Sequence, residues 1–188
     1  MNRLVPFEIA FAFTGSFHII YPSFTIGLAA WLTVHEGGFQ WSGKPVYRRL
    51  FEFWLAIFAF AFGLDVVSGI VMAFEFGTNW SSLSEATGPI RGPLLAYESF
   101  TAFALEASSF GVLIFGRLRV PPLLHFFSTA MVALGTMLSA FWIVVNNSWM
   151  QAPVGYAIEN GVYVPTDWKS IIFSPVVWVR FPHMLLAA

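Results

Sequence analysis

The sequence contains no cysteine. The chain therefore forms no disulfide, holds no iron–sulfur cluster through thiolates and attaches no c-type haem covalently. Charged residues are also scarce: they make up 10% of the 188 residues, against about 25% in an average soluble domain. The net charge of −1 gives no indication of nucleic-acid binding. These shortages exclude an ordinary soluble domain and point to an integral membrane protein.

Apolar residues are abundant instead, at 57% of the chain, with a mean hydropathy of +0.72. Four segments are long enough to span a bilayer, at about 6–33, 53–74, 92–116 and 123–145. A fifth begins near Val176 and reaches Ala188 after only about 20 Å of helix, short of the roughly 30 Å hydrocarbon core. We therefore predict an all-α polytopic bundle, with four complete spans and a truncated fifth, as one transmembrane domain covering residues 1–188.

The connections between the spans alternate in charge. Basic residues gather in the first and third connections: Lys44, Arg48, Arg49, Arg117 and Arg119. The second connection has only Arg91, opposed by Glu75 and Glu85. The positive-inside rule then places the first and third connections in the cytoplasm and the N-terminus outside.

The third span carries two acids, Glu98 and Glu106, although one charge at the centre of a span costs roughly 2.5–3.5 kcal/mol or more. On an α-helix they lie about 80° apart around the axis and about 12 Å apart along it. Both acids could be structural groups, protonated or paired with neighbouring helices. Spaced carboxylates inside a membrane are also the usual material of a proton relay, and this is the interpretation we favour.

Other polar side chains follow helical spacing inside the spans. In the first span Thr14, His18, Tyr21 and Thr25 form one stripe. A stripe in the fourth span, predicted to face a hydrated path or the acids of the third, consists of His125, Ser128, Thr136, Ser139 and Asn146. Asp65 lies alone in the second span, and we favour a structural explanation for it.

Two histidines lie within predicted spans, His18 in the first and His183 in the fifth. Each could be a hydrogen-bonded core residue or an axial haem ligand, because neutral imidazole binds iron well. Three classes of protein fit the residues alone: a haem-bearing respiratory protein, a proton-coupled transporter without haem, and a structural membrane subunit.

Several segments resemble, in the same order along the chain, subunit I of cytochrome bd-type quinol oxidases. They are FAFTGSFHIIYPSFTIGL around His18, GIVMAFEFGTNW at 69–80, GPLLAYESFTAFALEASSFG at 92–111, LSAFWIVVNNSWMQAPVG at 138–155 and SPVVWVRFPH ending at His183. MAFEFGTNW and the GRLR connection are similar to the cyanide-insensitive branch. The resemblance implies a multi-pass protein of the bacterial plasma membrane, paired with a second oxidase subunit. It also implies electron transfer from quinol to O₂ through haem b and haem d, or through haem b in place of haem d.

The resemblance also implies roles for individual residues. His18 matches the iron ligand of a high-spin haem, which is b-type in some members and d-type in others, and the sequence leaves both open. His183 matches the ligand of the low-spin haem b that receives electrons from quinol. Glu106 and Glu98 match the two acids that lead protons inward from the cytoplasm, with Glu98 the deeper of the two. The resemblance also implies that Glu98 is the proton donor closest to the oxygen site and, with His18 and His183, a cofactor-binding residue. Ser139 matches a serine on the same route.

The chain departs from its relatives in three ways. Asp65 stands where relatives have a small residue, and Glu75 stands where some have glutamine, so neither acid takes a role from the family. The methionine that completes the low-spin haem, the quinol-binding loop and a later glutamate belong to sequence beyond these 188 residues. The fragment alone is therefore expected not to oxidise quinol.

Overall fold

The computed structural model of the chain describes residues 5–188. Its elements are α1 (Val5–Ser42), α2 (Pro45–Thr78), α3 (Ser81–Glu98), the π-helical turn η1 (Ser99–Phe103), α4 (Ala104–Phe115), α5 (Pro122–Gln151), β1 (Tyr156–Glu159), β2 (Val162–Pro165), α6 (Trp168–Ile172) and α7 (Pro175–Ala187). Five helical stretches are long and apolar enough to cross a bilayer: Phe7–Ser42, Pro45–Thr78, Ser81–Phe115, Pro122–Gln151 and Trp168–Ala187. The predicted all-α bundle is confirmed, and its fifth stretch begins earlier than the predicted Val176.

The helices extend beyond the predicted spans at several ends. The first span was predicted to end near Thr33, whereas α1 continues to Ser42, because the polar side chains of Glu36 and Gln40 on its last turns find partners on other elements. The link to α2 is only Gly43–Lys44, and Gly43 has φ +65°, a left-handed conformation that suits glycine. Pro45 then opens α2 at a position where its missing N–H is tolerated. Arg48 therefore lies on a helix and not in a loop.

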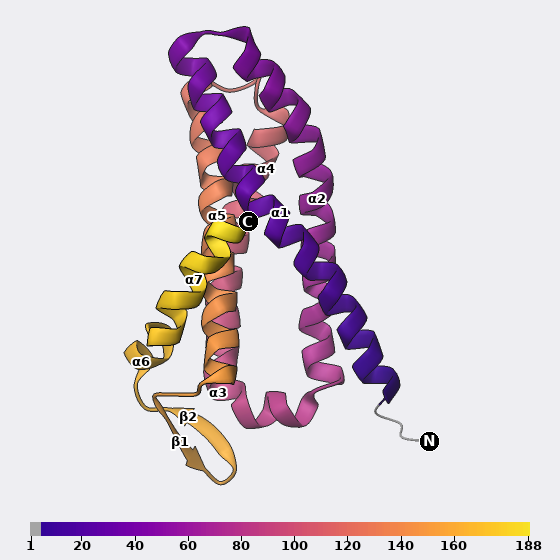
Figure 1. Cartoon of the computed structure of the whole chain (residues 1–188), viewed down its shortest axis with the longest axis vertical. Coiled ribbons are helices and arrows are strands. Elements are labelled where there is room, and N and C mark those ends of the chain that lie inside the picture. The colour runs from indigo at the N-terminus through magenta and orange to yellow at the C-terminus, as the bar shows by residue number, and fades with distance from the viewer. Residues whose placement is uncertain (1–4) are drawn as a thin grey trace.

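Figure 1 shows how the spans are arranged. Helices α1 and α2 run antiparallel from their shared link, and the first turns of α3 cross the opposite end of the bundle. Helix α5 is central, since it packs against α1, α3, η1, α4 and α7. One apolar core joins α5 to α1, α2 and α4 through residues that include Leu32, Phe58 and Val132. A second core at the other end includes Leu94, Val145 and Val177.

The pair α1–α2 is joined by polar contacts inside its apolar surface. Three side chains of α1 each hydrogen-bond a side chain of α2: Thr14 with Glu75 at 3.0 Å, His18 with Ser68 at 2.9 Å and Thr25 with Asp65 at 3.2 Å. Polar groups buried between transmembrane helices favour such pairing, because lipid offers no partner. The predicted stripe on the first span is confirmed for these three residues, and it faces α2.

The connection between α5 and α6 contains a small antiparallel hairpin in which Tyr156 pairs with Pro165 and Glu159 with Val162. Asn160 and Gly161 form its turn with φ values of 51° and 83°, the conformation that two-residue hairpins favour. Tyr163 packs edge-on against Trp149 of α5. The hairpin thereby covers the second core.

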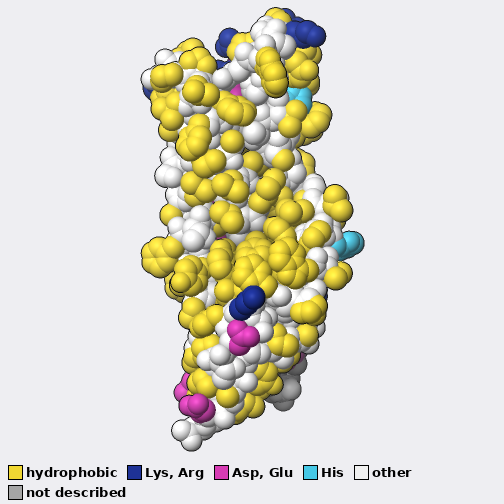
Figure 2. All heavy atoms as spheres, turned by 90° about the vertical axis from the view of Figure 1, so that its left-hand side faces the viewer, with side chains coloured by type: hydrophobic (Ala, Val, Ile, Leu, Met, Phe, Trp, Pro, Cys, Tyr) yellow, Lys and Arg dark blue, Asp and Glu magenta, His cyan; other side chains and the backbone are white. Residues whose placement is uncertain are grey.

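The surface divides into an apolar middle and charged ends. In Figure 2 hydrophobic side chains cover most of the visible face, and Lys and Arg gather at the upper end. This is the end at which α1 meets α2 and α4 meets α5. The charge asymmetry inferred from the connections is thus present in the folded chain.

Two glycine substitutions are expected to change stability in opposite directions. Gly43→Ala puts a side chain on a left-handed residue, which costs about 1–2 kcal/mol. Gly63→Ala meets no atom within 4 Å in the interior of α2 and should stabilise the helix by about 0.5 kcal/mol. Denaturant or thermal unfolding of the full-length subunit in detergent measures both. A Gly43→Ala protein as stable as its parent would contradict the assigned link geometry.

Candidate functional site

The third span contains a π-helical turn between its two acids, since η1 covers Ser99–Phe103. An uninterrupted α-helix would hold Glu98 and Glu106 about 80° apart. A π turn accommodates one extra residue. The eight residues from Glu98 to Glu106 therefore turn about the helix axis by about as much as seven α-helical residues, and the two acids lie about 20° apart. The predicted separation of 80° is therefore wrong. The wide turn places both carboxyl groups on the same side of the span.

That side faces α5. The Ser139 hydroxyl donates a hydrogen bond of 2.9 Å to Oε1 of Glu98. Glu106 fits against Gly135, where an added Cβ would lie 2.5 Å from Cγ of the glutamate. Gly135 and Ser139 are one helical turn apart on the same face of α5. The structure therefore brings together the three residues predicted for a proton route.

The two carboxyl groups have different surroundings. Glu106 is 6% exposed, and its carboxyl group makes no hydrogen bond or ion pair with any side chain in residues 5–188. Glu98 is half-buried and also approaches the Ser99 hydroxyl at 3.4 Å. A buried carboxyl without a partner requires either a proton or a polar neighbour. The arrangement suits groups that bind and release protons.

His18 is held by its Nδ1 atom, which lies 2.9 Å from Oγ of Ser68. That hydroxyl donates its own hydrogen to backbone carbonyls of α2, at 2.6 Å to Leu64 and 3.1 Å to Asp65. Its oxygen therefore accepts a hydrogen from the imidazole, which places the ring hydrogen on Nδ1. Nε2 is left with its lone pair and has no hydrogen-bond partner among the described residues. This is the tautomer that a metal-ligating histidine needs.

The space around His18 also fits a ligand to iron. A Cβ at Gly69 would lie 3.2 Å from Cε1 of the imidazole, so glycine there gives the ring room to lie against α2. Gly15, one turn before His18 on α1, has open space beside it, with no atom within 4 Å of an added Cβ. An oriented imidazole with a free Nε2 and an open flank fits an axial haem ligand.

The second predicted ligand has fewer contacts. His183 lies on α7 with an exposed side chain, and within residues 5–188 it makes no hydrogen bond or ion pair. The described residues thus leave its imidazole open to a partner outside them, and they do not bring another candidate ligand to it.

The polar stripe of α5 faces three different partners and not one path. His125 contacts Glu36 of α1 at 3.0 Å, Ser139 contacts Glu98, and Asn146 accepts a hydrogen bond of 3.1 Å from Arg91. Between these points the hydroxyls of Thr129 and Thr136 bond carbonyls of their own helix. The prediction that the stripe faces the acids of the third span is confirmed at Ser139 only.

Arg91 is another departure from the predicted pattern. It was placed in a short connection, yet it lies in α3 and is only 4% exposed. Its guanidinium carbon lies 4.7 Å from the centre of the Phe76 ring, and one terminal nitrogen has no partner in the described part of the chain. The first turns of α3 cross the end of the bundle and turn this residue inward.

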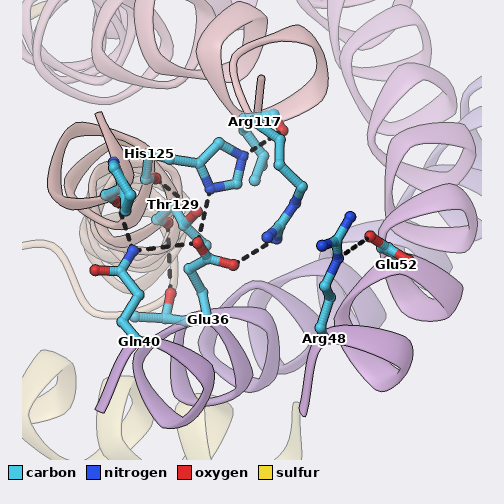
Figure 3. Close-up of polar contacts among 10 residues, drawn as sticks. Glu36, Gln40, Arg48, Glu52, Arg117, His125 and Thr129 are labelled. Atoms are coloured by element: carbon cyan, nitrogen blue, oxygen red, sulfur yellow. Dashed lines mark hydrogen bonds and ion pairs between the residues drawn. The ribbon is translucent and has the colours of Figure 1, made fainter. Parts of the chain in front are cut away.

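A buried ionic cluster at the other end was not predicted. Glu36 of α1 is 2% exposed and accepts hydrogen bonds from His125 at 3.0 Å, Arg117 at 2.5 Å and Gln40 at 3.2 Å. Figure 3 shows Glu36 between the imidazole and the guanidinium, with Gln40 beside it. The cluster joins α1 to α5 and to the link that precedes α5. The i, i+4 pair Glu36–Gln40, just past the predicted end of the first span, was the available sequence signal.

Both ring nitrogens of His125 face oxygen atoms. Nδ1 lies 3.0 Å from Glu36, and Nε2 lies 3.2 Å from the carbonyl oxygen of Leu113. A cavity of about 140 Å³ beside the cluster is lined by Glu36, Phe39, Gln40, Arg48, Arg117, Leu118, Pro122 and His125. The apolar core containing Val132 and Leu113 separates this cluster from Glu106.

Known proteins resemble this chain along its whole described length. The chain is 37% identical over 188 residues to "Cytochrome bd ubiquinol oxidase subunit 1" of Bacillus subtilis (strain 168), covering 100% of this chain and 40% of that protein. It is 38% identical over 179 residues to "Cytochrome bd-II ubiquinol oxidase subunit 1" of Escherichia coli (strain K12), covering 94% of this chain and 35% of that protein. The chain thus spans about two fifths of the length of the relatives it matches.

A solved structure has the same fold. The bd oxidase from Geobacillus thermodenitrificans superimposes with a TM-score of 0.89 over 97% of this chain and 42% of that one, at 24% sequence identity. The family model for "Cytochrome bd terminal oxidase subunit I" matches residues 8–188. With its five apolar helical stretches, the chain is a multi-pass membrane protein, and it belongs to the cytochrome bd terminal oxidase subunit I family.

Proposed function

We propose that this chain is the haem-binding N-terminal part of a quinol oxidase subunit. The whole subunit would pass electrons from quinol to O₂ and take protons from the cytoplasm. The observation that carries the proposal is the face of α5 that meets Glu98 through Ser139 and Glu106 through Gly135. The relatives named as ubiquinol oxidases support the same activity. By this proposal the chain assembles with a second oxidase subunit in the bacterial plasma membrane.

The proposed cofactors are haem b and haem d, or haem b in both places. When bound, they supply the electron transfer and the oxygen reduction. His18 would hold the high-spin iron through Nε2, because Ser68 keeps the ring hydrogen on Nδ1. His183, on the exposed side of α7, would hold the low-spin haem b together with a residue outside this chain.

The carboxyl groups would move protons in response to charge. An electron that arrives at a buried site makes it more negative, which favours uptake of a proton by nearby carboxylates. Glu106 lies nearer the basic end of the bundle, and Glu98 lies deeper. With the basic end in the cytoplasm and the N-terminus outside, Glu106 receives the proton and Glu98 delivers it closest to the oxygen site. The Ser139 hydroxyl donates to Glu98, and its oxygen remains able to accept.

The substitution Glu106→Gln tests this route, because the amide keeps the shape of the side chain and cannot carry the proton. We expect oxygen consumption by the full-length oxidase to fall roughly 100-fold, as for loss of a proton-transferring group. Glu52→Gln is the matched control, since Glu52 is exposed and pairs with Arg48. Unimpaired oxygen consumption and proton uptake in Glu106→Gln would remove the role of Glu106.

Gly135→Ala tests whether Glu106 must lie against α5. The added methyl group would meet Cγ of Glu106 at 2.5 Å and push the side chain away. Turnover and thermal stability should both fall, and the double variant with Glu106→Ala should recover stability without recovering turnover. Gly111→Ala on α4, with no atom within 4 Å, should behave like the parent. Equal turnover in the two glycine variants would contradict this packing.

His18→Ala and His183→Ala separate the two proposed haems. A pyridine haemochrome assay and reduced-minus-oxidised spectra of the purified complex should show loss of the high-spin signal in the first variant. The second variant should lose the low-spin haem b signal. Retention of full pigment by both variants would contradict haem ligation and would favour a structural or transport role.

A further inference from the structure

Asp65 lies behind the imidazole of His18, on the side away from the free Nε2. Its Oδ1 atom is 3.7 Å from Nδ1 of His18, and the two side chains are only 19% and 23% exposed. This distance is too long for a hydrogen bond and is within the range of an ion pair. Asp65 therefore acts on the ring through its charge, while Ser68 makes the direct hydrogen bond.

The position of the carboxyl group is fixed by a second contact. Thr25 of α1 donates a hydrogen bond of 3.2 Å to Oδ2 of Asp65. His18 and Thr25 are seven positions apart, so they lie on the same face of α1 two turns apart. The carboxylate of α2 is thus held between two side chains of α1, with one oxygen directed to Thr25 and the other to the imidazole.

Charge next to the distal nitrogen of an imidazole changes what the other nitrogen does. A negative charge near an imidazole N–H polarises the ring and increases the electron density at the opposite nitrogen, which makes the ring a stronger donor to a metal. The same negative charge stabilises the more positive oxidation state of the metal, especially where little water screens it. A protein sets the reduction potential of a haem partly through the axial ligand and partly through the groups that contact this ligand.

We infer that Asp65 is a positioning residue for His18. Its carboxylate, held by Thr25, strengthens the bond from Nε2 to a haem iron and favours the ferric state. Ser68 fixes the tautomer, and Asp65 sets how strongly that tautomer donates. This inference rests on the proposed function, because it requires His18 to ligate iron.

The test uses the full-length subunit assembled with its partner subunit. Asp65→Asn keeps the size of the side chain and an oxygen for Thr25, and it removes the charge. We expect the iron–histidine stretching band of the ferrous high-spin haem in resonance Raman spectra to shift to lower wavenumber. The midpoint potential of that haem should shift to a more positive value. Glu52→Gln removes one charge from the same helix far from His18, and both readouts should match the parent.

The possible results separate this inference from the function on which it rests. If Asp65→Asn retains its haem with an unshifted band and potential, the inference is overturned and haem ligation by His18 stands. If Asp65→Asn loses the haem, Asp65→Glu decides, since it keeps the charge: haem with the parent's band supports the inference, and any other result overturns it. An iron–histidine band that persists in His18→Ala would instead overturn the ligand assignment in the proposed function.

Discussion

The constraint on which this structure depends is that a carboxyl group inside an apolar bundle needs a proton or a polar partner. The described chain meets this constraint differently at each acid. Glu36 has a guanidinium, an imidazole and an amide, Asp65 has a threonine, and Glu98 has a serine. Glu106 has none of these among residues 5–188 and is pressed against a glycine. The acids therefore range from a fully paired structural group to one whose charge is compensated by no neighbouring side chain.

These differences separate structural acids from functional ones. Breaking a buried pair by removal of one partner is strongly destabilising, typically by about 3–5 kcal/mol, so the Glu36 cluster is suited to hold α1 against the start of α5. A carboxyl without fixed partners can change its charge without leaving another buried charge unpaired. Glu106 has this property, and it lies against Gly135, one helical turn from Ser139 on α5. Under the proposed function, Ser139 and Glu98 would then be the next groups on the proton's route.

The fold was predictable from the sequence because apolar spans and polar stripes are strong signals over twenty residues or more. The predicted stripe put His18 and Thr25 on one face of α1, and the structure shows that this face contacts α2. The π-helical turn was not predictable in the same way, since one extra residue in a turn leaves no mark on composition. It nevertheless decides that Glu98 and Glu106 face the same helix. The π-helical turn thus changes the relative orientation of the two acids, whereas the differences between predicted and observed helix ends do not.

The missed residues have a common cause. Glu36 and Arg91 lie near the ends of spans, where a hydropathy pattern predicts solvent, and both are buried by elements that fold back over them. Burial of this kind depends on contacts between residues far apart in the chain, such as Glu36 with Arg117, which periodicity does not contain.

The two parts of the proposed function, haem ligation and proton transfer, involve different pairs of helices. His18 and the groups behind it belong to α1 and α2, whereas Glu98, Glu106 and Ser139 belong to the third span and α5. What fixes the distance between them is the packing of α1 and α2 against α5 and α4, through a core that includes Leu32, Phe58 and Val132. Because close-packed cores resist changes of volume, this apolar cluster keeps the imidazole and the carboxyl groups at a constant separation. Coupling between an electron and a proton falls with distance. Under the proposed function, this apolar core, which has no chemistry of its own, would therefore set the strength of that coupling.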